Sequence, residues 1–173
     1  MKKNRFILRA IVLGVIAIAL GGAFYTAYTS DGSSTQIGEP APDFTLINLE
    51  GENVRLSDLQ GKGVLINFWA TWCDPCKREM PLMENEYQKM KDEGIEFLAI
   101  NIAESELAVS RFTERLGLTF PILLDPDRAV TNLYEVGPIP STYFVDKDGI
   151  LVDHYTGEMS VRILKERLKL IQP

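Results

Sequence analysis

The sequence predicts an α/β domain in which helices cover a mixed central β-sheet. The first observation behind this prediction is a nearly continuous apolar run at residues 64–69, which is typical of a strand buried on both faces. The second is the order of the patterns, which alternates strand and helix twice and then ends in a β-hairpin and a final helix. A length of 173 residues with 46% apolar side chains suits one domain with a sizeable core, and hardly two.

Residues 1–28 predict an N-terminal signal-anchor transmembrane helix. The 19 residues at 10–28 carry no charge, and as a helix rising about 1.5 Å per residue they nearly span the ~30 Å hydrocarbon core of a bilayer. Basic residues precede them, which predicts a cytoplasmic N-terminus and a single pass through the cell membrane, with the rest of the chain on the extracytoplasmic side. A cleaved signal peptide is the alternative, and it would export the same domain.

Residues 29–36 are small and polar and predict a linker, and residues 37–173 are expected to form the exported domain. Residues 43–49 alternate in polarity and are followed by a second strand-like segment at 54–56. We therefore expect an added N-terminal β-hairpin ahead of the buried strand.

A long helix is expected directly after the buried strand. An apolar stripe at steps of three and four residues supports it, formed by Cys76, Met80, Met83, Tyr87 and Met90. The later patterns predict, in order, a strand at 95–102, a helix at 104–116, a strand at 121–124, a helix at 127–134, a hairpin of strands at 142–145 and 150–155, and a last helix marked by Val161, Leu164, Leu168 and Ile171.

Charge and cysteine content exclude several classes of protein. Residues 1–30 carry a charge of +4 and the remainder carries −10, so nucleic acid is not an expected partner, because phosphate binding needs a basic face. Two cysteines are too few for a disulfide scaffold. With His154 as the only histidine, they cannot complete a four-ligand zinc site of sulfur and imidazole, and we expect no metal.

The two cysteines, Cys73 and Cys76, lie between the buried strand and the start of the long helix. Their three-residue spacing brings the sulfurs within disulfide reach. The free N–H groups and positive partial charge of a helix N-terminus stabilise a thiolate, and Pro75 suits the first helical turn. We therefore predict a catalytic dithiol with Cys73 as the exposed attacking thiol and Cys76 as the buried resolving thiol. The dithiol itself carries two electrons, so we expect no bound cofactor.

Two stretches, FWATWCDPC at residues 68–76 and GPIPST at 137–142, resemble the active-site and cis-proline segments of thioredoxin-like proteins. The resemblance covers about residues 37–173 and implies a thioredoxin-like fold. It is most specific for the ResA-type branch of membrane-anchored, extracytoplasmic thiol–disulfide oxidoreductases, which serve cytochrome c maturation. The patterns G-x-x-A-P-D-F from Gly38 and C-x-x-E-x-P from Cys76 carry this part of the resemblance.

The resemblance also implies a surface that binds the substrate chain. The Ile139–Pro140 peptide bond would be cis and would hold the Ile139 backbone beside Cys73 as an edge for the substrate. An X–Pro bond is cis in only about 5–6% of cases, so this expectation rests on the resemblance. Trp72 would be exposed beside Cys73 as a further contact.

Two departures from classical thioredoxins bear on the chemistry. Asn67 stands where they have a buried aspartate, and by resemblance to the ResA-type branch Glu79 would mediate proton transfer at the dithiol. The alternative for Glu79 is a solvent-facing side chain in an early helical turn. Asp74, between the cysteines, partly opposes the helix field at Cys73 and favours its thiol form, so we expect a low reduction potential and a reductant.

The resemblance thus implies an enzyme that reduces disulfides in exported proteins. Its substrate would be apocytochrome c, whose C-x-x-C-H cysteines must be reduced before haem attachment, and a membrane thiol carrier of the CcdA/DsbD type would return the electrons. A general extracytoplasmic disulfide reductase is an alternative. A peroxiredoxin-like peroxidase or a copper-binding assembly factor is less favoured, because the P-x-x-x-T-x-x-C and C-x-x-x-C patterns of those proteins are absent.

Overall fold

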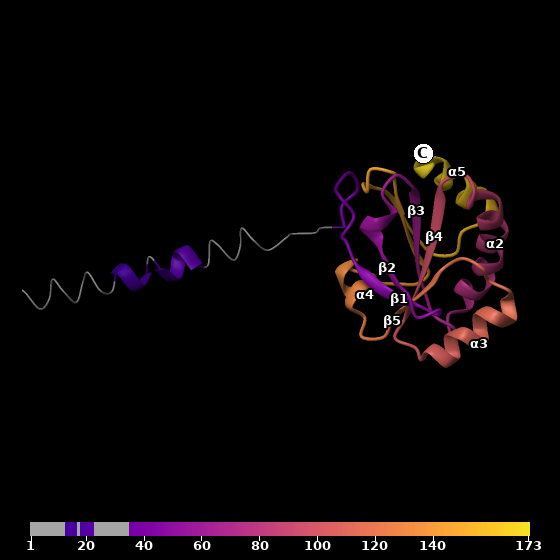
Figure 1. The fold of residues 1–173 in the computed structure, drawn as a ribbon, viewed down its shortest axis with the longest axis horizontal. Coiled ribbons are helices and arrows are strands. Elements are labelled where there is room, and N and C mark those ends of the chain that lie inside the picture. The colour runs from indigo at the N-terminus through magenta and orange to yellow at the C-terminus, as the bar shows by residue number, and fades with distance from the viewer. Residues whose placement is uncertain (1–12, 17, 23–34) are drawn as a thin grey trace, which may run out of the picture. The chain divides into compact units, whose positions relative to one another are not determined.

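The computed structural model describes residues 13–16, 18–22 and 35–173 of the chain (Figure 1). The chain divides into two compact units, Met1–Gly32 and Ser33–Pro173. In the first unit the described residues are helical and exposed. Most of the predicted signal-anchor segment, residues 1–28, and most of the predicted linker lie outside the described residues. Among the residues that the structure does describe, no helix is both long enough and apolar enough to span a bilayer.

The second unit is built on a mixed sheet, as the sequence predicts, and this sheet has seven strands. The strand order is β2-β1-β5-β4-β3-β6-β7, in which β3, β4 and β5 run parallel and the other neighbours run antiparallel. The strands are β1 (Thr45–Asn48), β2 (Asn53–Arg55), β3 (Gly63–Trp69), β4 (Ile95–Ile102), β5 (Ile122–Asp125), β6 (Ser141–Val145) and β7 (Leu151–Thr156).

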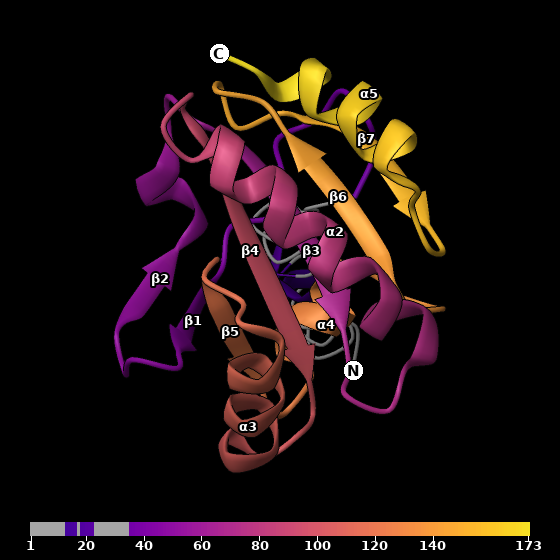
Figure 2. The same ribbon diagram turned by 90° about the vertical axis from the view of Figure 1, so that its right-hand side faces the viewer.

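Helices cover both faces of this sheet. They are the 3-10 helix η1 (Leu56–Leu59) and the α-helices α2 (Asp74–Met90), α3 (Glu106–Leu116), α4 (Ala129–Leu133) and α5 (Val161–Ile171). Figure 2 shows α2, α3 and α5 in front of the sheet and α4 behind it. Two apolar clusters fill the two layers, one with buried side chains of α2, α3 and α5 and the other with those of η1 and α4.

The central strand β3 is the best-fixed element of the sheet. All seven of its residues are buried, and it pairs with β4 on one side and β6 on the other. The continuous apolar run at 64–69 predicted this two-sided burial. The segment expected to contain an N-terminal hairpin holds β1 and β2, which pair antiparallel, and β1 also pairs with β5.

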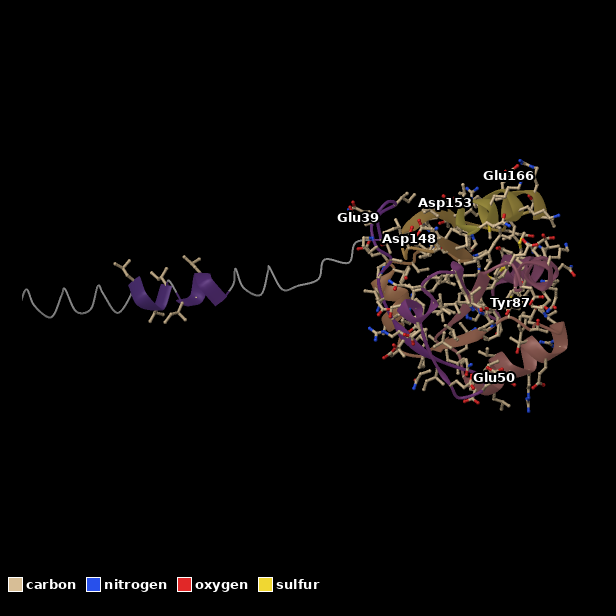
Figure 3. All side chains as sticks on the ribbon, turned by 45° about the horizontal axis from the view of Figure 1, so that its top comes forward. Glu39, Glu50, Tyr87, Asp148, Asp153 and Glu166 are labelled. Carbon is tan, nitrogen blue, oxygen red and sulfur yellow. A yellow bond between two sulfur atoms is a disulfide. The ribbon has the colours of Figure 1, made fainter. Side chains whose placement is uncertain are left out.

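The acidic charge of the domain is spread over its surface. The exposed side chains Glu39, Glu50, Asp148 and Glu166, labelled in Figure 3, come from separate segments of the fold.

Gly63 provides a test of how β3 packs against the C-terminal helix. A Cβ added at Gly63 would collide with the backbone carbonyl of Ile171 at the end of α5, which cannot rotate away as a side chain could. We expect Gly63→Ala to lower the free energy of unfolding by about 1–3 kcal/mol, the usual cost of overpacking. Urea unfolding of the disulfide-intact protein measures this value.

Gly137→Ala is the matched control, because a Cβ at Gly137 meets no atom within 4 Å. Its stability should be unchanged or slightly raised. Equal stability of the two variants would contradict the close contact between β3 and α5.

Candidate active site

Cys73 and Cys76 form a disulfide at the point where β3 leads into α2. Their Cα atoms are 5.3 Å apart. Cys73 is the N-cap of α2, and its Sγ accepts a hydrogen bond from the backbone N–H of Cys76 at 3.3 Å. Pro75 occupies the first turn, where a missing N–H costs nothing. The Cys73 sulfur therefore lies at the helix N-terminus and accepts from a helix N–H, as the prediction of a stabilised thiolate requires.

The prediction that Cys73 is exposed is wrong for this disulfide form. Cys73 is only 5% exposed and Cys76 only 1%. Both belong to the apolar cluster that also contains Met80, Met83 and Met159. Cys73 still has the greater exposure of the two.

The Ile139–Pro140 peptide bond is cis. Ser141, the next residue, lies opposite Phe68 in the β3–β6 register, so Pro140 lies near the end of β3 from which the cysteine turn departs. Ile139 packs against the apolar cluster that contains both cysteines. Trp72 in the cysteine turn is 66% exposed. The structure thus brings the predicted substrate-contact residues to the same end of the sheet as the disulfide.

Glu79 lies on α2, one turn after Cys76, and is only 1% exposed. This contradicts the alternative of a solvent-facing side chain. Its Oε2 accepts a hydrogen bond from the backbone N–H of Met159 at 3.4 Å, and no donor among the described residues reaches its Oε1. Burial raises the pKa of Glu79 to about 8, against the lowering effect of the Met159 N–H; the negative charge of Glu158 raises it further.

An ion pair holds the segment that covers Glu79. Arg78 donates two hydrogen bonds from Nε to the Glu158 carboxylate, at 3.1 and 3.0 Å, and one from Nη2 at 2.6 Å. Two consecutive residues of α2 thus bind two consecutive residues of the β7–α5 connection: Arg78 binds Glu158, and Glu79 binds Met159. The backbone N–H of Gly157 donates to Pro140 at 2.8 Å, which ties the same connection to the cis-proline.

Asn67 lies in the buried centre of β3 and donates from Nδ2 to Thr142 Oγ1 at 2.9 Å. An amide in this position does not ionise at physiological pH, so it cannot take the place of a buried carboxyl. Of the two buried carboxyls on α2, Glu79 lies one turn after Cys76, and the other, Glu86, pairs with Lys89. Within the described part of the chain, no group of three or more histidine, cysteine, aspartate or glutamate side chains could hold a metal ion.

Two features of this site were not predicted from the sequence. One is the contact of Glu158 and Met159 with α2, and the other is a pair of hydrogen bonds between Glu104 and Thr71. The partners are about 80 and 33 residues apart in the sequence. No motif or spacing connects them, so only the folded chain reveals them.

A C-x-x-C disulfide at a helix N-terminus, together with a cis-proline at the same end of a mixed sheet, defines a thioredoxin-like thiol–disulfide enzyme. A family model described as the AhpC/TSA family matches residues 37–154. The Geobacillus kaustophilus protein named thiol-disulfide oxidoreductase ResA is 44% identical, over 99% of each chain. The Bacillus subtilis protein of the same name is 41% identical, over 99% of this chain and 96% of that one.

A solved structure of a Chlorobium tepidum protein, assigned as thiol:disulfide interchange protein DsbE, matches with a TM-score of 0.75 at 28% identity. The match covers 81% of this chain and all of the other. The chain therefore belongs to the AhpC/TSA family and has a thioredoxin-like fold. Its relatives and its cysteine pair identify it as a protein thiol–disulfide oxidoreductase.

The raised pKa of Glu79 predicts how stability depends on pH. Between pH 4.5 and about 8 the folded protein keeps this proton while the unfolded chain releases it. The contribution of Glu79 to stability is therefore fully present below pH 4.5 and is lost as pH rises through this window, with a slope of up to about 1.4 kcal/mol per pH unit. Glu79→Gln should remove this part of the slope in urea unfolding of the oxidised protein. If the free energy of unfolding depended on pH in the same way in both proteins, the buried, protonated carboxyl would be contradicted.

The Arg78–Glu158 ion pair predicts a second effect on Glu79. Glu158→Gln removes a negative charge close to Glu79, and the loss of this charge lowers the pKa of Glu79. We expect the carbon-13 NMR titration of the Glu79 carboxyl to shift to lower pH. Glu166→Gln, which removes one carboxylate of the exposed Arg162–Glu166 pair on α5, is the control and should leave the titration in place. An equal shift in both variants would contradict a local effect.

Proposed function

We propose that this oxidoreductase acts as a reductant of disulfides in exported proteins, and that its substrate is the haem-binding cysteine pair of apocytochrome c. The observation that carries the proposal is the burial of Glu79 one helical turn after Cys76. It places an ionisable proton carrier on the face of α2 that holds the dithiol. The resemblance of the C-x-x-E-x-P pattern to the ResA-type branch supports the choice of substrate.

The reaction proceeds in two exchanges. The Cys73 thiolate attacks one sulfur of the substrate disulfide, which forms a mixed disulfide and releases the other substrate sulfur as a thiolate that takes up a proton. Cys76 then loses its proton and attacks the Cys73 sulfur. The Cys73–Cys76 disulfide forms, the second substrate sulfur leaves as a thiolate, and two electrons have passed to the substrate.

Glu79 carries protons during the second exchange. Its pKa of about 8 lies close to the ~8.5 of an ordinary cysteine thiol. A proton can therefore pass between Cys76 and Glu79 in either direction at little cost in free energy. A carboxyl with its usual pKa would be a much weaker base towards a thiol.

Asp74 supports the proposed direction of electron flow. This exposed side chain pairs with Lys77 at 2.8 Å, and that hydrogen bond lowers its pKa, so Asp74 is an anion near neutral pH. Its negative charge next to Cys73 disfavours the thiolate and so destabilises the reduced form of the protein. A less stable reduced form gives a lower reduction potential, which is typical of a reductant and not of a strong oxidant. Lys77 offsets part of this charge, so the effect is smaller than for a free aspartate.

The location and the electron donor complete the proposal. The basic and apolar character of residues 1–28 supports a signal anchor with the catalytic domain on the extracytoplasmic side of the cell membrane. A membrane thiol carrier of the CcdA/DsbD type would then return two electrons to the Cys73–Cys76 disulfide. No bound cofactor takes part in either exchange.

Trapping of the mixed disulfide tests the proposal. In Cys76→Ala the resolving thiol is missing, so a peptide with an oxidised C-x-x-C-H segment of apocytochrome c should remain bound to Cys73 as an adduct seen by mass spectrometry. Cys73→Ala, with Cys76 retained, is the matched control and should give little adduct, because Cys76 is the more deeply buried.

Two outcomes would contradict different parts of the proposal. Preferential trapping at Cys76 would overturn the assigned roles of the two thiols. The same Cys76→Ala variant can be used to trap partners in cell membranes. If it traps other exported proteins but no apocytochrome c, the proposed substrate is wrong and a general disulfide reductase is favoured.

A further inference from the structure

The turn that leads into Cys73 is hydrogen-bonded to Glu104, a residue of another loop. Glu104, between β4 and α3, accepts a hydrogen bond from the backbone N–H of Thr71 at 2.6 Å and one from the Thr71 hydroxyl at 2.5 Å. The two carboxylate oxygens take one bond each. Thr71 lies two residues before Cys73, so these bonds hold the segment that leads into the attacking cysteine.

Glu104 is itself held in place. Asn101, buried in β4, donates from Nδ2 to the same Glu104 oxygen that accepts the Thr71 N–H, at 2.8 Å. Ala103, between Asn101 and Glu104, has a left-handed backbone with φ of 54°, which is unfavourable for a residue other than glycine. Its backbone N–H donates to the carbonyl oxygen of Asp125 at 3.0 Å. The loop is thus fixed to β5 as well as β4, and the carboxylate is half-buried with three donors directed at it.

This contact matters most when the disulfide is reduced. In the oxidised form the bond to Cys76 ties the turn to α2 covalently. The dithiol form lacks that tie, and the bonds to Glu104 join the turn to a loop that contains neither cysteine. Cys73 must then stay at the N-cap of α2, because the helix N–H groups stabilise its thiolate only over a short distance.

We propose that Glu104 is a positioning residue that acts through Thr71 to hold the reduced Cys73 at the N-terminus of α2. The inference rests on the proposed attack by Cys73 but not on the proposed substrate. Glu104 does not touch the sulfurs and transfers no proton. It fixes the position of the Cys73 thiolate. A displacement of a reacting group by about 1 Å can lower the rate of its reaction by up to about a hundredfold.

The hydrogen-bond pattern allows geometry and charge to be tested separately. In Glu104→Gln, the amide oxygen can accept from the Thr71 N–H and from Asn101, and the amide NH₂ can donate to the Thr71 hydroxyl, which rotates to accept. All three contacts are therefore retained without the charge. Glu104→Ala removes all three.

The test uses the reduced full-length protein and the small disulfide 5,5′-dithiobis(2-nitrobenzoate) under native conditions. We expect the reaction of the first thiol to be about tenfold slower in Glu104→Ala, in proportion to the loss of two charge-assisted bonds on the turn, and its pH midpoint to move upward. Glu104→Gln should react within about twofold of the parent. Glu106→Ala, which removes a neighbouring exposed carboxylate in the first turn of α3, should match the parent.

Other outcomes would overturn the inference. A structural role alone would lower the urea midpoint of Glu104→Ala but leave its rate and pH midpoint unchanged. Equal slowing in the Gln and Ala variants would show that charge, not position, matters. Should Glu104→Ala fail to fold, Thr71→Ala, which deletes one donor, should still slow the reaction about threefold, and an unchanged rate would contradict the inference.

The reagent also separates this inference from the proposed function. It needs no apocytochrome c, so a wrong substrate does not affect the result. Cys73→Ser should abolish the fast reaction. If the fast reaction persists in that variant, the attack by Cys73 fails, and the role of Glu104 fails with it.

Discussion

The reactive part of this protein depends on the junction between a fully buried strand and the N-terminus of a helix. β3 is held by neighbours on both sides and by apolar layers on both faces, so the position of its last residue is well fixed. The chain turns over three residues and enters α2 with Cys73 as N-cap. A sulfur in this position meets free helix N–H groups, which favour a thiolate and hence disulfide exchange.

Burial of the Glu79 carboxyl beside this junction lowers the stability of the folded protein near neutral pH and raises the pKa of the carboxyl. The charged form of the Glu79 carboxyl is more stable in water than in the protein interior, so burial raises its pKa to about 8. The fold tolerates this because Glu79 keeps one backbone hydrogen bond and because its neighbour Arg78 binds Glu158. The result is a carboxyl whose pKa resembles that of a thiol, as the proposed proton transfer requires and as an exposed glutamate could not provide.

Much of the fold and of the reactive centre was predictable, for reasons that differ by element. The apolar run of β3 and the stripe of α2 report burial directly, because the periodicity of a strand or helix is a local property. The C-x-x-C pair was recognisable because its chemistry needs two residues on one helical turn. The cis-proline was expected only through resemblance to known proteins, since a sequence alone favours a trans bond.

By itself the sequence determined the class of enzyme, the two cysteines that form the disulfide and the helix that begins at them, because these depend on residues adjacent along the chain. Only the tertiary structure decided that both cysteines of the disulfide are covered, that Glu79 is buried rather than solvent-facing, and which groups surround it. It alone placed Glu158 next to Arg78 and Glu104 next to Thr71. The pKa of a carboxyl and the position of a thiol are set by groups distant in sequence, and their arrangement exists only once the chain has folded.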